Sequence, residues 1–348
     1  MSAAKGKHKD IASAISDPKT HLSAIKALGR SPGGFLSREW RRALWLRLLN
    51  INPDLSEHWR VDTQDYGHFG PDEMKSMSVI DADVARCVAQ WDVHLGIRKS
   101  YRSRVRGDLR AILTALVLKH GPSGFRYYQG LHEVGLVCLH VGNTTQAYHL
   151  LEGISLIYLR GYLYKPFTVS LLPSTEAVLW LLSRVDPNLH AHLVSTECPA
   201  FFTVPWLLTW FAHSFSCVSS LERVFDFLLC SSPPSIIFLS VAVLTHKRIE
   251  LLTITDSAEM HSKCQSLPGC FTKSELETVI GRANNLMEEP FFSDLVRTYP
   301  ESMQGMVVET SPVKKAARAF TTGAAVAVAA FGMAVLVPFL RAGEAMRP

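Results

Sequence analysis

The chain lacks the sequence motifs of the usual nucleotide-binding and acyl-transfer sites. It contains no G-x-x-x-x-G-K-[ST] phosphate loop, no G-x-G-x-x-G after a strand and no G-x-S-x-G elbow that would present a nucleophilic serine. His132 and Glu133 begin like the helical zinc motif HExxH, but Leu136 occupies the position of the second histidine. We therefore expect any chemistry to use the substrate pocket of another protein.

The chain has neither a strong excess of one charge nor a cysteine pattern typical of metal or redox sites. Its 36 Lys and Arg against 31 Asp and Glu leave a net charge of +5. This value is well short of the dense basic stripe of a nucleic-acid-binding protein, so we expect no nucleic-acid partner. The seven cysteines form no C-x-x-C pair and lie mostly in apolar surroundings. We predict reduced, buried thiols, no metal site and no cofactor bound by the chain itself.

The two ends of the chain differ in character. The first ten residues, MSAAKGKHKD, are polar and lack the apolar core of a signal peptide, so we expect most of the chain in the cytosol. Residues 319–340 contain no charge, and these 22 residues would form about 33 Å of helix, enough to span a bilayer. We predict a single-pass C-terminal membrane anchor. Because the segment is rich in Ala and Gly, the alternative is a helix packed against the domain.

Helical periodicity dominates the remaining sequence, and we find no internal repeat and little strand-like alternation. The predicted architecture is all-α, with an N-terminal tail at 1–19, one domain at 20–298, a linker at 299–318 and the anchor at 319–340. The apolar run at 235–244 is too short for a second span and is predicted to be a buried core helix. The predicted helices cover residues 9–28, 36–50, 79–95, 101–120, 130–141, 145–160, 173–184, 203–216, 219–230, 234–249, 273–287 and 291–298.

An aspartate and an arginine flank the buried face of the helix predicted at 79–95. At 100° per residue, an arc of about 100° contains the apolar side chains of Ile80, Val84, Cys87, Val88 and Trp91. Asp83 lies on one flank of this arc and Arg86 lies further round, so we expect neighbouring side chains that point toward solvent or a partner. Taken alone, such a pair is typical of a weak surface ion pair.

The segment YYQG, residues 127–130, places a glutamine between two apolar runs. Glutamine has no charge and no useful pKa, but its amide donates and accepts hydrogen bonds at once, which suits the positioning of a water molecule. Taken alone, Gln129 is better interpreted as a loop residue that caps the helix beginning near Gly130.

The two segments together resemble the TBC domains that activate Rab GTPases. Ile80 to Arg86 fits the motif I-x-x-D-x-x-R, and YYQG fits Y-x-Q-G, in the expected order and about 40 residues apart. Residues 33–50 resemble the opening helix of the family, with Arg42 and Trp45 at its R-x-x-x-W positions. Residues 204–215 and 223–229 resemble its later tryptophan-rich and R-x-x-D helices. The resemblance covers about residues 20–300.

The resemblance implies an activator of another enzyme, not an enzyme with its own substrate. Arg86 would be an arginine finger and Gln129 would orient the attacking water, both inside the nucleotide site of a GTP-bound Rab, which itself holds the GTP and Mg²⁺. Asp83 would hold Arg86 in place, Tyr128 would pack beside the glutamine, and Gly130 would let the backbone approach the GTPase closely.

The resemblance also implies a cellular setting. It is strongest to the tail-anchored branch of the family, which is associated with the cytosolic face of the endoplasmic reticulum and early Golgi and with traffic between them. The alternative is a non-catalytic, membrane-anchored adaptor that binds a Rab without turnover. A basic run at 98–110 has three interpretations: a solvated helix face, part of the Rab-binding surface, or a contact with acidic lipid.

Overall fold

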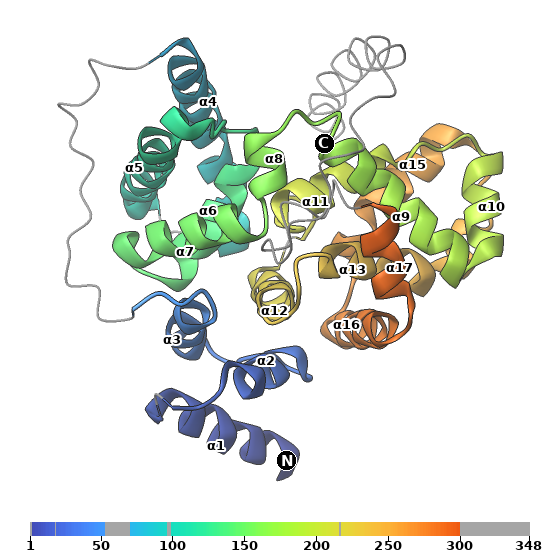
Figure 1. Cartoon of the computed structure of the whole chain (residues 1–348), viewed down its shortest axis with the longest axis horizontal. Helices are drawn as coiled ribbons and strands as arrows, with labels where there is room; N and C mark the ends of the chain where they lie inside the picture. The colour runs from blue at the N-terminus through green and yellow to red at the C-terminus, as the bar shows by residue number, and fades with distance from the viewer. Residues whose placement is uncertain (1, 18, 53–69, 96–98, 216, 300–348) are drawn as a thin grey trace.

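The computed structural model describes residues 2–17, 19–52, 70–95, 99–215 and 217–299, and every regular element in these ranges is a helix. The predicted anchor at 319–340 lies outside the described residues, as does the predicted linker apart from Tyr299. Within the described ranges no helix is both long enough and apolar enough to cross a membrane. The α-helices, all of them labelled in Figure 1 except α14, are α1 (Ser2–Ser16), α2 (Leu22–Arg30), α3 (Arg38–Leu48), α4 (Pro71–Leu95), α5 (Arg102–His120), α6 (Leu131–Val141), α7 (Thr144–Ile157), α8 (Arg160–Tyr164), α9 (Leu171–Val185), α10 (Pro187–Ser195), α11 (Val204–Thr209), α12 (Val218–Leu229), α13 (Ser235–His246), α14 (Arg248–Leu251), α15 (Ser257–Ser266), α16 (Lys273–Glu288) and α17 (Phe291–Thr298).

The all-α prediction is confirmed, but several helix boundaries differ. The helix predicted at 9–28 is two helices, α1 and α2, and the sequence carries a proline at position 18, which a helix interior does not tolerate well. The helix predicted at 203–216 ends at Thr209. The short helix α8 was not predicted, nor were α10 and α15. Each of the latter two begins with an aspartate N-cap whose side chain accepts a hydrogen bond from a backbone N–H three residues on.

The first helix packs against the domain. Ile11 and Ala14 of α1 are buried in the common hydrophobic core, and the Lys7 ammonium donates to the hydroxyl of Ser31, 2.8 Å away, and to its carbonyl oxygen. Figure 1 shows α1 beside α2 and α3. The segment that the sequence analysis set apart as a tail at 1–19 thus contributes apolar side chains to the core.

The helices form two groups on either side of α11 and α12. One group consists of α4 to α7, and the other contains α9, α10, α13 and α15 to α17, as Figure 1 shows. Helix α13, which contains the apolar run at 235–244, is buried along that whole run, because it packs against α9 and α16. The prediction of a core helix for this run is confirmed.

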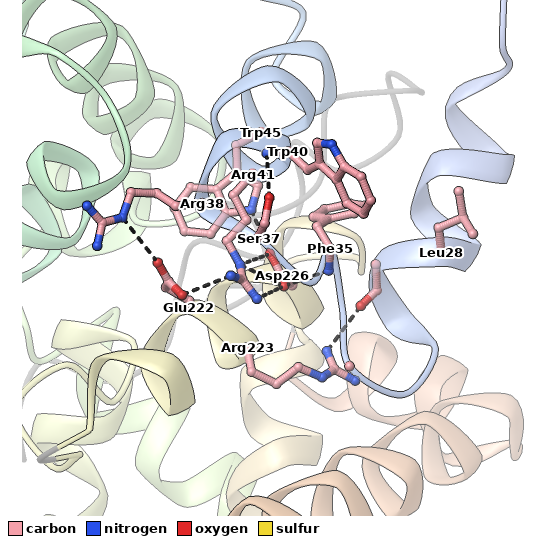
Figure 2. Close-up of polar contacts among 12 residues, drawn as sticks. Leu28, Phe35, Ser37, Arg38, Trp40, Arg41, Trp45, Glu222, Arg223 and Asp226 are labelled. Atoms are coloured by element: carbon pink, nitrogen blue, oxygen red, sulfur yellow. Dashed lines mark hydrogen bonds and ion pairs between the residues drawn. The ribbon is translucent and has the colours of Figure 1, made fainter. Parts of the chain in front are cut away.

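A buried ion-pair network connects α3 to α12 (Figure 2). Asp226 is fully buried and accepts hydrogen bonds from the Nε of Arg41 (3.0 Å), the indole Nε1 of Trp45 (2.8 Å) and the backbone N–H of Phe35 (3.0 Å). A second carboxylate of α12, Glu222, accepts from the Nη1 of Arg41 at 2.8 Å. Burial raises the pKa of the Asp226 carboxyl, and the charge and hydrogen bonds of Arg41 counteract this effect.

This network corrects one motif assignment. Arg42 was predicted at the first position of R-x-x-x-W, but the arginine that pairs with Asp226 is Arg41, four residues before Trp45. Arg42 instead donates through its Nε to the carbonyl oxygen of Val141 at 3.0 Å. Four residues is one helical turn, so Arg41 and Trp45 share the face of α3 that meets Asp226.

Candidate functional site

Helix α4 presents Arg86 at the surface and Asp83 in the interior. Ile80, Val84 and Cys87 are buried, as the helical arc predicted. The side chain of Arg86 is 53 % exposed, whereas that of Asp83 is only 1 % exposed, so the prediction that both side chains point outward was wrong for the aspartate. The Nη2 of Arg86 donates to the Oδ1 of Asp83 at 2.6 Å. A surface guanidinium is thus held by a buried carboxylate, which distinguishes this pair from an ordinary exposed ion pair.

Asp83 is itself held by two residues of the segment that contains Gln129. The hydroxyl of Tyr127 donates to the Oδ2 of Asp83 at 2.7 Å, and the Nδ1 of His132 lies 3.3 Å from the same oxygen. Burial alone raises the pKa of a carboxyl, but the contacts with His132, Tyr127 and Arg86 outweigh it and hold the pKa of Asp83 below its ordinary value. Asp83 is therefore an anion that connects α4 to the YYQG segment.

Gln129 lies in the turn immediately before α6, and its side chain is exposed. Gln129 follows Tyr127 by two positions, and Tyr127 binds Asp83. Asp83 in turn lies about one helical turn before Arg86, which it binds. The structure thus brings the elements that carry Arg86 and Gln129 together, through side chains between them that are buried or partly buried. The predicted pairing of these elements follows from the Asp83–Tyr127 hydrogen bond.

Tyr128 and Gly130 anchor the other side of the same turn to α11. Tyr128 is buried, and its hydroxyl donates to the carbonyl oxygen of Leu208 at 2.8 Å. Gly130 has a φ of +118°, in the left-handed region that favours glycine, and a Cβ there would lie 3.0 Å from the Cγ2 of Thr209. Gly130 is thus needed for packing against α11, and its predicted approach to a partner stays a prediction.

The chain reverses directly after α11, and this reversal supports the turn. Trp210 and Phe211 are buried and adopt φ values of +53° and +64°, which are strained for large side chains. The turn after them presents His213, whose Nδ1 lies 2.8 Å from the Oε1 of Glu133 on α6. The end of α11 therefore contacts Tyr128 of the Gln129 turn through Leu208, and His213 beyond it contacts the first turn of α6.

Four residues near the site were not assigned a role from the sequence: Tyr127, His132, Glu133 and His213. Three of them belong to one continuous segment, YYQGLHE, so their proximity to Gln129 was available as a signal. His213 lies about 80 residues further on and gave no such signal, because its place depends on the reversal after α11.

The basic run at 98–110 is partly neutralised by carboxylates. Arg110 pairs with Asp81 of α4, and its Nη2 lies 3.0 Å from an oxygen of Asp81. Arg104 pairs with Asp108 one turn along α5, at 3.7 Å. Both arginine side chains remain more than half exposed. Exposed ion pairs of this kind agree with the interpretation of the basic run as a solvated helix face. Arg98 lies outside the described residues.

A family comparison and a search of curated proteins both find relatives. The model of the Rab-GTPase-TBC domain matches residues 38–252. The chain is 27 % identical over 316 residues to human TBC1 domain family member 20, an alignment that covers 89 % of this chain and 74 % of the relative. It is 26 % identical over 259 residues to the GTPase-activating protein gyp10 of Schizosaccharomyces pombe, covering 73 % and 66 % of the two chains.

Solved structures share the fold. The Ypt/Rab-GAP domain of Gyp1p superposes with a TM-score of 0.64 at 15 % identity, covering 81 % of this chain and 98 % of that one. The Chlamydomonas flagellar RabGAP TBC domain gives a TM-score of 0.53, also at 15 % identity, covering 77 % and 86 %. At this identity the likeness concerns the arrangement of helices and not the residues of the site.

Proposed function

Because the chain belongs to the Rab-GTPase-TBC domain family, whose activity is the stimulation of GTP hydrolysis by Rab GTPases, we propose that Arg86 and Gln129 are the two residues that carry this activity. The observation that supports the assignment is the connection between them. An exposed guanidinium and an exposed amide lie on two elements joined by the buried Asp83 and by Tyr127. Neither side chain is needed for the core, so both are free to enter a partner.

The proposed mechanism divides the chemistry between the two side chains. During GTP hydrolysis negative charge builds up on the phosphate oxygens, and Arg86 stabilises it from outside the GTPase. An arginine supplied in trans raises the rate by about 10³–10⁵, which corresponds to roughly 4–7 kcal/mol of barrier. Gln129 donates a hydrogen bond to the phosphate side and accepts one from the attacking water, which places that water in line. The GTP and its Mg²⁺ belong to the Rab.

Phosphate release from a panel of GTP-loaded Rabs tests this proposal. We expect the wild-type domain to stimulate at least one Rab, and Arg86→Ala and Gln129→Ala each to lose most of that stimulation. Arg297→Ala is a matched control, because Arg297 forms an ion pair with Asp294 at the same spacing of three residues, with its side chain also exposed, on α17. Full stimulation by both site variants would contradict the two-residue mechanism. No stimulation of any Rab by the wild type would favour the adaptor.

We further propose that residues 319–340 anchor this domain to the cytosolic face of the endoplasmic reticulum or early Golgi. The support is the run of 22 uncharged residues, the basic residues on both sides of it, and the resemblance of the sequence motifs to the tail-anchored branch of the family. Removal of residues 316–348 is expected to release the protein into the soluble fraction of a cell lysate. A truncated protein that still pelleted with membranes would contradict the anchor.

A further inference from the structure

A second exposed side chain near the Gln129 turn is held by a buried carboxylate. His213 follows α11, and its side chain is 47 % exposed. Its Nδ1 lies 2.8 Å from the Oε1 of Glu133 in the first turn of α6, and the side chain of Glu133 is only 9 % exposed. The arrangement repeats that of Arg86, a half-exposed guanidinium that is held by the buried Asp83.

The two carboxylates belong to one polar cluster. The ring of His132 lies between them, with its Nδ1 3.3 Å from the Oδ2 of Asp83 and its Nε2 4.0 Å from the Oε1 of Glu133. The carboxylate that holds the proposed arginine finger and the carboxylate that holds His213 are therefore neighbours of the same buried ring.

Backbone contacts connect the turn that carries Gln129 to His213. The N–H of Glu133 donates to the carbonyl oxygen of Gly130 at 3.0 Å, and the N–H of His213 donates to the hydroxyl of Thr209 at 3.1 Å. Thr209 also limits the space at Gly130, since a Cβ there would lie 3.0 Å from its methyl group. The exposed ring of His213 thus flanks the turn that presents Gln129.

The backbone before His213 is strained. Trp210 and Phe211 both have positive φ values, which large side chains rarely adopt. Aromatic packing offsets this cost: the rings of Trp210 and Phe225 meet edge to face at 5.2 Å, and Phe211 stacks on Trp206 at 5.3 Å. Strain that is fixed by packing occurs preferentially at functional sites. The reversal is therefore a second observation, independent of exposure, that points to a function for His213.

The contact with Glu133 decides which edge of the His213 ring faces outward. A carboxylate only accepts hydrogen bonds, so the Nδ1 of His213 donates to it. The second ring nitrogen, Nε2, is on the opposite edge of the imidazole and points away from Glu133. Nε2 accepts a hydrogen bond in the neutral ring and donates one in the charged ring, so in either form it can bind a polar group.

We propose that His213 is a recognition residue for the Rab, whose Nε2 forms a hydrogen bond with a polar group beside the nucleotide site of the GTPase while Glu133 positions the ring. This inference rests on the proposed roles of Arg86 and Gln129, because these two residues define the edge of the domain that meets the Rab. They supply the charge and the contact with water that hydrolysis needs. His213 therefore contributes to binding of the GTP-loaded Rab and not to the chemical step.

Two amide substitutions separate recognition of the Rab from support of Glu133. The amide of His213→Asn takes the place of Nδ1, so it still donates to Glu133 but does not reach the position of Nε2. The amide of His213→Gln takes the place of Nε2, so it keeps the outward hydrogen bond and loses the contact with Glu133. A ring that only supported the buried carboxylate would be replaced better by asparagine, whereas a ring that binds the Rab is replaced better by glutamine.

The experiment measures kcat and KM at neutral pH with increasing concentrations of the GTP-loaded Rab that the wild-type domain stimulates most. We expect His213→Ala and His213→Asn each to raise KM about 5-fold, the effect of one lost hydrogen bond, with kcat unchanged. His213→Gln should keep KM within about 2-fold of the wild-type value. The affinity for the same Rab loaded with a non-hydrolysable GTP analogue should change by the same factors.

His246 supplies a matched control in the other group of helices. It is the last residue of α13, its side chain is 22 % exposed, and its Nε2 lies 3.6 Å from the Oε1 of Glu275. His246→Ala should keep the wild-type KM and kcat. Thermal unfolding of all variants is measured as well, and we expect His213→Ala and His213→Asn to unfold close to the wild-type temperature, because the exposed ring contributes little to the core.

The outcomes separate this inference from the proposed function. The role of His213 is overturned if His213→Ala leaves KM unchanged or lowers kcat in place of raising KM. It is also overturned if His213→Gln raises KM as much as His213→Asn does. Arg86→Ala is measured alongside. Loss of kcat with Arg86→Ala but no change in KM with His213→Ala overturns the role of His213 alone. Full stimulation by Arg86→Ala and Gln129→Ala, or a wild type that stimulates no Rab, overturns both proposals.

Discussion

At the scale of single residues, Asp83 connects the interior of the domain to its surface. It is almost fully buried, yet one of its oxygens binds the exposed guanidinium of Arg86 and the other accepts from Tyr127. A side chain that enters a partner loses conformational entropy when it becomes ordered there, and the ion pair between the Arg86 guanidinium and the fixed carboxylate reduces that cost by ordering the side chain beforehand. In the mechanism that we propose, the position of the buried anion therefore bears on catalysis, although Asp83 itself would touch no substrate.

Replacing Asp83 with asparagine should weaken both stability and activation. We expect a loss of about 1–3 kcal/mol in the free energy of unfolding at pH 7, because the hydrogen bonds lose their charge. Since the pKa of Asp83 is lower in the folded protein than its ordinary value of 3.8, its contribution is present above that value and is lost as the pH falls below it. Urea unfolding from pH 3 to 7 would check this, and a stability difference that grew on acidification would contradict it.

A second prediction at this scale concerns Gly130. Gly130→Ala should destabilise the domain both through its positive φ and through contact of the new methyl group with Thr209. Gly124 provides the control, because its φ of +96° is also left-handed but a Cβ there meets nothing within 4 Å. We expect Gly124→Ala to cost about 1–2 kcal/mol and Gly130→Ala to cost more and to lower kcat.

Thr209→Ser should then restore part of what Gly130→Ala loses, because it removes the Cγ2 that the new methyl group meets and keeps the hydroxyl. That hydroxyl donates to the carbonyl oxygen of Pro205 and accepts from the N–H of His213. Chemical denaturation and GTPase assays of the single and double variants would measure the coupling. If Gly130→Ala lowers stability and activity equally with threonine and with serine at position 209, contact with the threonine methyl group is not the cause of the loss.

At the scale of elements, the helices themselves were largely predictable and their ends were not. The apolar spacing in α4 identified its buried face, because that spacing is imposed by the helix alone. The end of α11 was not predictable in this way, since the residues after Thr209 continue a helical pattern. There Trp210 and Phe211 turn inward and are buried among other aromatic side chains, including Phe225 beside Trp210, and this packing overrides local preference.

The same distinction applies to the site. Arg86 and Gln129 were predicted from motifs, because a motif is a pattern of residue types and their order, which the sequence contains in full. That Asp83 faces inward, and that Tyr127 rather than Tyr128 binds it, depends on how α4 packs against the segment before α6. Asp83 and Tyr127 are 44 positions apart in the sequence, and the contact between them is set by tertiary packing. The periodicity within one helix contains no information about such a contact.

A prediction for the α3–α12 connection follows from its burial. Arg41→Leu should cost about 3–5 kcal/mol, because it leaves the carboxylate of Asp226 buried without its cationic partner. The adjacent Arg42→Leu should cost about 1 kcal/mol, since it removes one partly buried hydrogen bond to a backbone carbonyl. Urea unfolding of both variants would check the contrast, and equal losses would contradict the assignment of Arg41 to the motif.

A double variant tests whether the unpaired carboxylate of Asp226 causes the loss of stability in Arg41→Leu. When Asp226→Leu is added to Arg41→Leu, the double variant should be more stable than the sum of the two single losses predicts, because neither charge is then buried alone. Strict additivity would indicate that the two side chains act independently, in spite of the distance of 2.9 Å between the Arg41 Nη2 and Asp226.

At the scale of the whole molecule, one continuous core contains side chains from α1 to α17, including Ile11 near one end of the described chain and Leu295 near the other. Contacts between residues that are distant in the sequence hold the helices around this core together. The guanidinium of Arg223 on α12 donates to the carbonyl oxygen of Gly29 and pairs with Glu277 of α16. The N-terminal helices and the C-terminal group therefore stabilise each other.

Thiol reactivity offers a test at this scale, because five of the seven cysteines are buried and two are exposed. Hydrogen bonds from the Ser219 hydroxyl and nearby backbone lower the pKa of Cys217, so it should react with iodoacetamide first at neutral pH. Burial raises the pKa of Cys198 to about 11, and that of the other buried thiols too. Mass spectrometry of the native protein should find modification at Cys217 and Cys270, and rapid modification of a third cysteine would contradict the single core.

The separation of Arg41 and Asp226 by 185 positions has a consequence for biosynthesis. A ribosome that adds about 5–20 residues per second needs about 10–40 s to reach the aspartate after it has made the arginine. During that interval α3 has no carboxylate to neutralise Arg41 and no α12 against which to bury Trp45. Helix α3 of the nascent chain therefore keeps apolar surface exposed until α12 has been made, and this is the period in which chaperone binding would most affect the yield of folded protein.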